Sequence, residues 1–184
     1  MLGLVISNIL VYHLVDYASV GFAIVCSYFS EKEEIGYLYQ KTLGICFLIC
    51  IATTPLIYLS DKALFLLSFD RELVDGATDY AWALVPSFYL YAFLTVNKNY
   101  LQSQGVIFLP ILLHLASFLF HLFICTALVL RGTFDLVSSA WIKNFSDAFC
   151  CILFYVYVTF WEPTPESWVE WSSRATNNIG RFLK

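Results

Sequence analysis

Charged residues are scarce in this sequence. Lys, Arg, Asp and Glu make up 13% of its 184 residues, whereas soluble globular domains carry about 25%. A water-soluble domain of this length needs a polar shell around its core, and here 60% of the residues are hydrophobic. The mean hydropathy is correspondingly positive. The composition therefore predicts an integral membrane protein, with lipid covering much of its surface.

Other absences exclude whole classes of function. The ten Lys and Arg residues form no basic stripe, which excludes a nucleic-acid partner. The six Cys residues lie in apolar stretches without the Cys/His spacing of a zinc site, so they predict no metal site and say nothing about the redox compartment. No Ser/His/Asp set, HExxH motif or Gly-rich phosphate loop is present. We therefore expect neither an enzyme nor a cofactor.

Long runs with few charges are what the sequence does contain, and crossing a bilayer takes about 20 mostly apolar residues. Five such runs predict an all-α, multi-pass bundle of about five transmembrane helices. The runs cover residues 1–29, 42–60, 77–96, 99–130 and 138–161.

Polar segments separate these runs. Residues 30–41 are predicted to begin the second helix, and residues 131–135 to form a tight turn around Gly132. Residues 61–75 are predicted to be a connection whose apolar patch, 63–69, lies at the membrane interface. Residues 162–184 change character and are typical of an amphipathic surface helix. We therefore divide the chain into a bundle, 1–161, and a linker, 162–184, which the Lys and Arg distribution places in the cytoplasm, with the N-terminus outside.

Four short sequence patterns occur along the chain in an order that is typical of one family. They are Ile35–Lys41 (IGYLYQK), Tyr80-Ala81 followed by Pro86, Tyr100–Gln104 (YLQSQ), and Ser167-Trp168 with Trp171-Ser172 and Ala175. Together they resemble the multidrug and toxic compound extrusion transporters in their eukaryotic form. The resemblance gives a structural role to seven residues: Gly36, Gln40, Tyr80, Pro86, Gln102, Gln104 and Trp168.

The resemblance implies an antiporter that exports organic cations, xenobiotics or metabolites in exchange for protons or sodium. Members of this family have two six-helix lobes around a central cavity. The five predicted spans correspond to helices two to six of the first lobe, so the first helix and the second lobe are expected to be missing. Self-association or a separate second lobe would then complete the cavity, in the plasma membrane or a vacuolar-type membrane.

The chain departs from the family pattern at one place of interest. Prokaryotic members carry an Asn and an Asp four residues apart on the fifth helix, and the comparable pair here is His121 and Cys125. A carboxylate for cation coupling is therefore absent from that place. In the eukaryotic branch the coupling carboxylates belong to the second lobe. The alternative reading is thus a truncated, non-transporting membrane protein with a structural or regulatory role.

Three residues are candidates for binding substrate or ion. Asp16 lies in the middle of a span, where a carboxylate either faces a cavity or is paired locally, with Tyr12 or His13. His121 lies deep in its span, where it could relay protons or hydrogen-bond across helices. Tyr89 belongs to an aromatic-rich stretch that could hold a planar cation through cation–π contacts or fill a helix interface.

One further charged pair is interpreted as structural. Lys143 and Asp147 are four residues apart, so on a helix they share one face and neutralise each other. Asn144 begins a formal glycosylation sequon, but its predicted depth in the membrane argues against its use.

Overall fold

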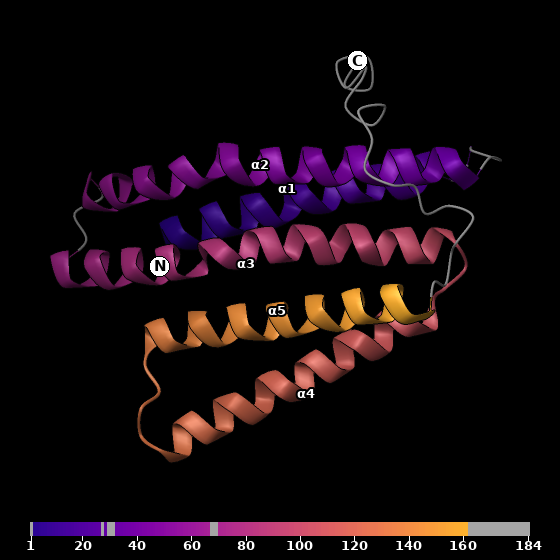
Figure 1. Cartoon of the computed structure of the whole chain (residues 1–184). Coiled ribbons are helices and arrows are strands. Elements are labelled where there is room, and N and C mark those ends of the chain that lie inside the picture. The colour runs from indigo at the N-terminus through magenta and orange to yellow at the C-terminus, as the bar shows by residue number, and fades with distance from the viewer. Residues whose placement is uncertain (1, 27, 29–31, 67–69, 162–184) are drawn as a thin grey trace.

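The computed structural model describes residues 2–26, 28, 32–66 and 70–161. Within these ranges the chain forms five α-helices and no strand: α1 (Leu2–Cys26), α2 (Lys32–Leu66), α3 (Arg71–Ser103), α4 (Phe108–Leu130) and α5 (Leu136–Trp161). The all-α bundle of five helices predicted from the sequence is confirmed. The colour gradient in Figure 1 shows the chain direction alternating from each helix to the next.

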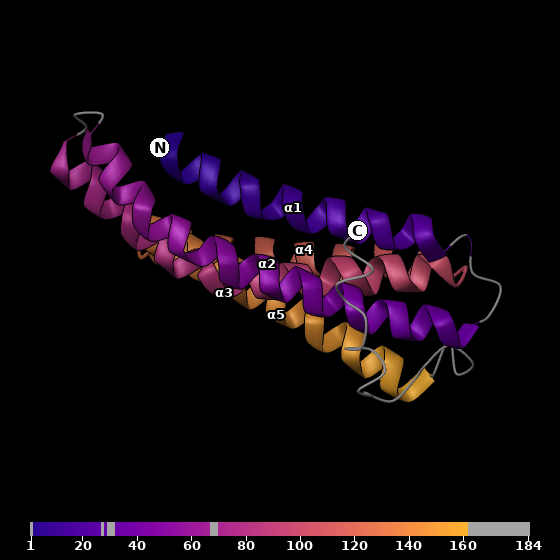
Figure 2. The same ribbon diagram turned by 90° about the horizontal axis from the view of Figure 1, so that it is seen from above.

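The arrangement has a centre and a periphery. In Figure 1, α3 lies between α2 and α5, while α4 lies on the outer side of α5 and is inclined to it. Helix α3 packs against α1, α2 and α5, whereas α4 packs mainly against α5. Figure 2, the view from above, shows α1 lying beside α2 along most of its length. The largest buried side chains of the core come from α1, α3 and α5; they include Phe22, Phe88, Tyr100 and Phe154.

Helix α2 is longer than the sequence predicted. It begins at Lys32, as expected, but it continues through Pro55 as far as Leu66, so residues 61–66 are helical and not part of a connection. The prediction of a loop here was wrong because Asp61 and Lys62 interrupt the apolar run without interrupting backbone hydrogen bonding. At 1.5 Å per residue the 35 residues of α2 span about 52 Å, more than the roughly 30 Å of a hydrocarbon core. The C-terminal end of α2, which carries Asp61 and Lys62, can therefore lie beyond the lipid tails.

Helix α3 likewise begins earlier than predicted, at Arg71 instead of near residue 77. Both helix-to-helix turns that follow it are built on glycine. Gly105 and Gly132 have φ angles of 81° and 68°, in the left-handed region that other residues rarely adopt. Around each glycine the backbone closes a Schellman motif, with Gly132 N–H donating to Val129 O and Thr133 N–H to Leu128 O. The predicted turn around Gly132 is confirmed.

The start of α5 is fixed by a reciprocal cap. The Ser138 backbone N–H donates to Asp135 Oδ1 over 2.6 Å, and the Asp135 N–H donates to Ser138 Oγ over 2.9 Å. This is a capping box with serine at the third helical position. The hydrogen bonds from Ser138, led by that of its side chain, hold the pKa of the Asp135 carboxyl below its usual value.

Two helices contain stretches that are long and apolar enough to cross a membrane by length and composition alone: residues 34–56 of α2 and 108–130 of α4, among the described residues. The α4 stretch is 6% buried inside the bundle. An apolar core helix of a soluble protein would instead be mostly buried. The most apolar helix of this chain therefore faces outwards.

Candidate functional site

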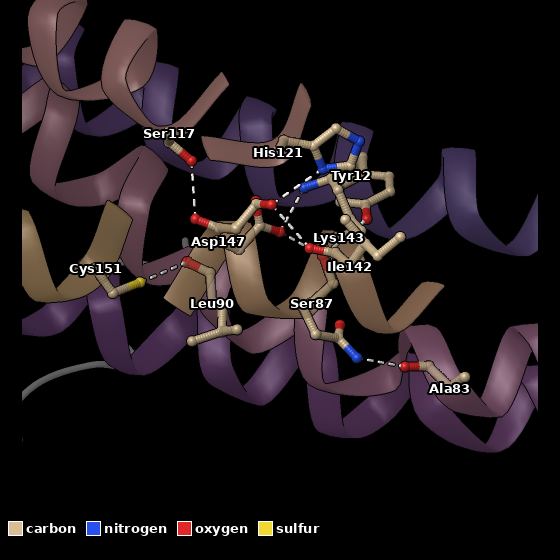
Figure 3. Close-up of polar contacts among 12 residues, drawn as sticks. Tyr12, Ala83, Ser87, Leu90, Ser117, His121, Ile142, Lys143, Asp147 and Cys151 are labelled. Atoms are coloured by element: carbon tan, nitrogen blue, oxygen red, sulfur yellow. Dashed lines mark hydrogen bonds and ion pairs between the residues drawn. The ribbon is translucent and has the colours of Figure 1, made fainter. Parts of the chain in front are cut away.

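Six polar side chains from three helices gather beside the centre of α3, and we call them the α3 polar cluster. They are Tyr12 and Asp16 of α1, Ser87 and Tyr91 of α3, and Lys143 and Asp147 of α5. Figure 3 shows four of them, with Tyr12 and Lys143 near the Ser87–Asp147 contact. The cluster contains two carboxylates and one ammonium group, so its formal charge is −1.

Asp147 is the buried acid of this cluster. Its side chain is 11% exposed, and its Oδ2 atom accepts a 2.6 Å hydrogen bond from Ser87 Oγ. The same oxygen forms an ion pair with Lys143 of the preceding helical turn, which confirms the pairing predicted from their spacing. Ser87 Oγ also lies 3.5 Å from the Tyr12 hydroxyl, which extends the contact to α1. The chain of hydrogen bonds therefore joins α1, α3 and α5.

Asp16 is the second acid, and it is half-buried. Its Oδ1 atom accepts a 2.7 Å hydrogen bond from the Tyr91 hydroxyl of α3. The hydrogen bond described here thus joins Asp16 to α3, whereas His13, one of the two local partners considered from the sequence, stacks on Tyr17 and is exposed. The Tyr12 ring instead meets the Tyr91 ring edge-on, with centroids 4.6 Å apart. Asp16 thus lies beside two aromatic rings.

His121 belongs to a different interface, between α4 and α5. Its Nδ1 atom lies 3.0 Å from Ser146 Oγ, and Ser117 Oγ donates to Ser146 O over 2.8 Å. His114, one heptad earlier, also meets α5, through an edge-on contact with Phe154 at 5.9 Å. Both histidines therefore face the same neighbouring helix, because residues seven apart lie on nearly the same helix face.

Tyr89 lies at a third interface, between α2 and α3. Its hydroxyl is 3.4 Å from Thr54 Oγ1, and its ring stacks on Phe47 with centroids 6.1 Å apart. These polar and ring contacts of Tyr89 are with α2, whereas the hydrogen bond of Asp16 joins α1 and α3. The structure therefore distributes the three predicted candidates over three helix pairs and does not bring them into one site.

Most of the family-motif residues lie near helix ends or at contacts between helices. Gly36 and Gln40 are buried in the first turns of α2, and Tyr80 packs against the Ala83, Leu84 and Ala140 contact between α3 and α5. Three more lie along or just after α3: Pro86 is exposed within the helix, Gln102 is exposed near its end, and Gln104 follows it with a buried amide nitrogen. Trp168 lies outside the described residues.

Several buried polar residues of α3 and α5 were missed from the sequence. Asn99 donates to Ser19 of α1 over 2.6 Å, and Asn144 donates to the Ala83 carbonyl over 2.6 Å. Tyr39 of α2 donates to Asn97 over 3.2 Å. The available signal was the presence of amides and hydroxyls inside long charge-poor runs, because such groups need a partner when water is absent.

The α3 polar cluster can hold charge, but it lacks the ligand set of a transition-metal site. The described residues contain no group of three His, Cys, Asp or Glu side chains placed to bind a metal ion. What the cluster offers is one carboxylate paired with Lys143 and a second, Asp16, whose hydrogen-bond donor among the described residues is the Tyr91 hydroxyl. An arrangement of this kind can accept a proton or pair with a single positive charge.

Comparison with known proteins places these helices in context. The family model described as MatE matches residues 2–126. "Protein DETOXIFICATION 17" of Arabidopsis thaliana is 23% identical over 151 residues, which cover 82% of this chain and 32% of that protein. "Multidrug and toxin extrusion protein 2" of Mus musculus is 25% identical over 150 residues, covering 77% and 26% respectively. The matched region thus spans about a third or less of the length of these relatives.

Proposed function

The chain belongs to the MatE family, and we propose that it takes part in exporting organic cations, xenobiotics or metabolites across a membrane in exchange for protons or sodium. Relatives with "multidrug and toxin extrusion" in their names support transport over catalysis. The family consists of integral membrane transporters, and the outward-facing apolar surface of α4 agrees with this. We propose that all five helices span the bilayer, in the plasma membrane or a vacuolar-type membrane.

The main observation in favour of a cationic substrate is the position of Asp16 near the Tyr12–Tyr91 ring pair. A carboxylate within a transmembrane helix is costly and faces a partner or a cavity. Here it is half-buried and hydrogen-bonded to Tyr91, and the rings of Tyr12 and Tyr91 stand beside it. A carboxylate together with aromatic rings attracts an organic cation through both Coulomb and cation–π terms. Asp16 is therefore the residue we propose to bind the substrate or to exchange the proton.

The two other candidates receive supporting roles in this proposal. We propose that His121 passes a proton between α4 and α5, and its contact with Ser146 supports this role. Tyr89, in contact with Thr54 and Phe47, belongs to the aromatic lining on the α2 side. Because these residues lie at separate interfaces, we propose that they act at different stages of a rocking motion rather than together on one bound molecule.

Alternating access needs two bundles that rock about a site between them. We therefore propose that this bundle works with a second one. The relatives that it matches are about three times as long as the aligned region or longer, which supports a second bundle of similar or larger size.

Transport by the purified chain in proteoliposomes tests the proposal. A fluorescent organic cation inside the vesicles should leave when a proton or sodium gradient is imposed. Asp16→Asn should reduce this efflux at least tenfold, because it removes the charge and keeps the shape. The matched control is Asp79→Asn, which changes an exposed carboxylate of α3.

Two results would count against this function. Unchanged gradient-driven efflux by Asp16→Asn would remove that residue from the mechanism. Absence of efflux by the correctly folded wild-type chain, under both gradients, would support the alternative of a non-transporting membrane protein with a structural or regulatory role.

A further inference from the structure

We propose that Lys143 is a tethered cation, whose ammonium group fills a binding site for one small monovalent cation, a proton or Na⁺, formed by Asp147, Ser87 and Tyr12. The inference rests on the proposed function, because it locates a coupling-ion site in this chain. The site lies where α5 faces α3, and Tyr12 of α1 joins it through Ser87; Figure 3 shows the four side chains.

The first step is the difference in burial between the two charges. The Asp147 side chain is 11% exposed, whereas that of Lys143 is 40% exposed. The carboxylate is therefore fixed inside the helix contact, and the ammonium reaches it from the edge. A lysine has four carbons between its backbone and its charge, so it can swing outwards without any movement of the helix. Of the two partners, Lys143 is the one that can leave.

The second step concerns what remains when Lys143 has left. Asp147 then keeps one hydrogen bond, the 2.6 Å contact from Ser87, which does not neutralise a buried carboxylate. A charge in this position must acquire another positive charge or take up a proton. Charge balance therefore requires that one cation replace another, and the site holds a single positive charge at a time.

The third step is that the two hydroxyls can serve either occupant. A hydroxyl has one donor and two acceptor positions, and its hydrogen can rotate. With Lys143 in place, Ser87 donates to Asp147 and lies 3.5 Å from the Tyr12 hydroxyl. With Na⁺ in place, the same hydroxyl oxygens can turn their lone pairs towards the ion, beside the carboxylate. No backbone rearrangement is needed for the exchange.

The charged and titratable groups around Asp147 come from all the elements near it. Lys143 lies on the same helix as Asp147. Cys150 and Cys151 of that helix lie close enough to Asp147 to interact electrostatically with its charge. Tyr12 approaches from α1 through Ser87, and Tyr80 of α3 lies near Tyr12. On the α4 side, His121 contacts the adjacent Ser146. Lys143 is the one permanent positive charge in this set, so it is the competitor that an external cation must displace.

This arrangement makes cation binding competitive within the chain. The affinity for an external ion is lowered by the fraction of time that the ammonium occupies the site, as for any binding state that is only partly populated. Removing the positive charge of Lys143 should therefore expose a site that the wild-type chain largely conceals. Asp16, which forms no ion pair with a lysine in the described part of the chain, is not subject to this competition.

The test is ion-dependent thermal unfolding of the purified full-length chain in detergent. Lys143→Met keeps a long apolar side chain without its charge. Its unfolding midpoint should rise saturably either with Na⁺ at pH 8, against choline at equal ionic strength, or with acidification in choline; the responding arm identifies the ion. The rise should be about 5 °C or more at a hundredfold excess over the dissociation constant.

Three controls define the result. Lys143→Arg keeps the pair and should respond no more than the wild type. The double variant Lys143→Met with Asp147→Asn lacks the carboxylate and should respond to neither ion. The proposal is overturned if folded Lys143→Met shows no larger response than the wild type in either arm, or if the double variant retains the response.

A second measurement needs no variant and covers the case in which Lys143→Met does not fold. Acylation of lysine amines at constant pH 8, followed by peptide mass spectrometry, reports how often each ammonium is free. Na⁺ in place of choline should speed the labelling of Lys143 relative to Lys98, which serves as the internal reference. Equal rates in the two salts would exclude a sodium site.

These readouts are independent of transport. If the chain exports no cation but Lys143→Met binds one, the proposed function fails and the site stands. If export is observed but neither readout responds to ions, the site fails alone.

Discussion

Helices α3 and α4 follow one another in the chain, yet they occupy opposite surroundings. Fifteen of the 33 residues of α3 are buried, against two of the 23 residues of α4. Helix α3 nevertheless carries the buried amides and hydroxyls, including Ser87, Asn97 and Asn99, whereas α4 exposes large apolar side chains such as Phe118, Leu119 and Phe123. In a water-soluble bundle the apolar helix would be central and the polar one peripheral. The inversion indicates that lipid is the solvent.

The polar contacts of the two helices differ in the same way. Helix α3 exchanges hydrogen bonds with α1, α2 and α5 through Tyr91, Asn97 and Ser87. The side-chain hydrogen bonds that α4 makes to other helices go to α5, through Ser117, His121 and the Leu113 carbonyl. Without a hydrophobic driving force between helices in lipid, such contacts and close packing hold the bundle together. The central helix should therefore be far more sensitive to substitution than the peripheral one.

The largest effect is expected from one substitution made in both helices. Phe88 of α3 is completely buried, whereas Phe118 of α4 is 59% exposed. Phe88→Ala should lower the free energy of unfolding by about 3–5 kcal/mol, because it leaves a cavity in the core. Phe118→Ala should change it by less than about 0.5 kcal/mol. Chemical unfolding in detergent micelles measures both, and equal losses would mean that the α4 face is packed against protein.

The next effect tests the surroundings of α4 itself. Leu119 lies in the middle of the helix and is 56% exposed, while Leu130 lies at its end and is 82% exposed. Leu119→Lys should oppose membrane insertion by about 3 kcal/mol, because it places a charge at the centre of the bilayer. Leu130→Lys should cost little, since the side chain can reach the interface.

A glycosylation-based insertion assay on the full chain compares the two lysine variants directly. If they insert equally well, the exposed face of α4 does not meet the hydrocarbon of the membrane, and the comparison between α3 and α4 loses its explanation.

The sequence was sufficient for the architecture because helices in lipid are marked by runs without charge. All five helices, the start of α2 and the turn at Gly132 were predicted from such runs and from glycine. The errors occur where the bounds of a helix differ from the bounds of an apolar run. The charges at 61–62 and within 71–76 made these segments read as parts of a connection, but the residues there continue or begin helices, because backbone hydrogen bonding does not depend on side-chain polarity.

In the candidate site, the sequence could predict only contacts between residues that are close together in the chain. The Lys143–Asp147 pair followed from a separation of four residues. The Tyr91–Asp16 and Ser87–Asp147 hydrogen bonds join residues 75 and 60 positions apart, so they depend on how α3 is rotated against its neighbours. A charge-poor run predicts that a helix will be buried in lipid or protein, but it does not determine which of its polar groups face which helix.

A smaller effect is expected at the contact that attaches α4 to α5. His121 Nδ1 lies 3.0 Å from Ser146 Oγ. A double-mutant cycle with His121→Ala and Ser146→Ala should give a coupling of about 0.6 kcal/mol, the average for hydrogen bonds between membrane helices. Pairing His121→Ala with Thr126→Ala should give none, because the Thr126 hydroxyl bonds to its own helix. A coupling above about 2 kcal/mol would show that α4 is held as firmly as α3.

The smallest effect concerns the exposed cap between α4 and α5. Hydrogen bonds from Ser138 lower the pKa of Asp135 below its ordinary value of 3.8. A carboxyl whose pKa is lowered by folding contributes stability that is fully present above its unfolded pKa and is lost as the pH falls through the folded value. Asp135→Asn keeps a good helix cap but cannot titrate, so its stability should fall less steeply than that of the wild type below about pH 4.

The matched control for this cap is at the start of α3. Asp70 is the N-cap of α3, but its side chain makes no capping hydrogen bond within the described part of the chain. Asp70→Asn is therefore the control for removing an exposed carboxylate at a helix start, and Asp135→Asn should flatten the pH profile of unfolding relative to it. Because both carboxylates are exposed and precede a helix, identical profiles for the two variants would show that the Ser138 hydrogen bonds do not persist in solution. A difference would show that the boundary of the peripheral pair, α4 and α5, is fixed by side-chain capping, whereas the central helix α3 begins without it.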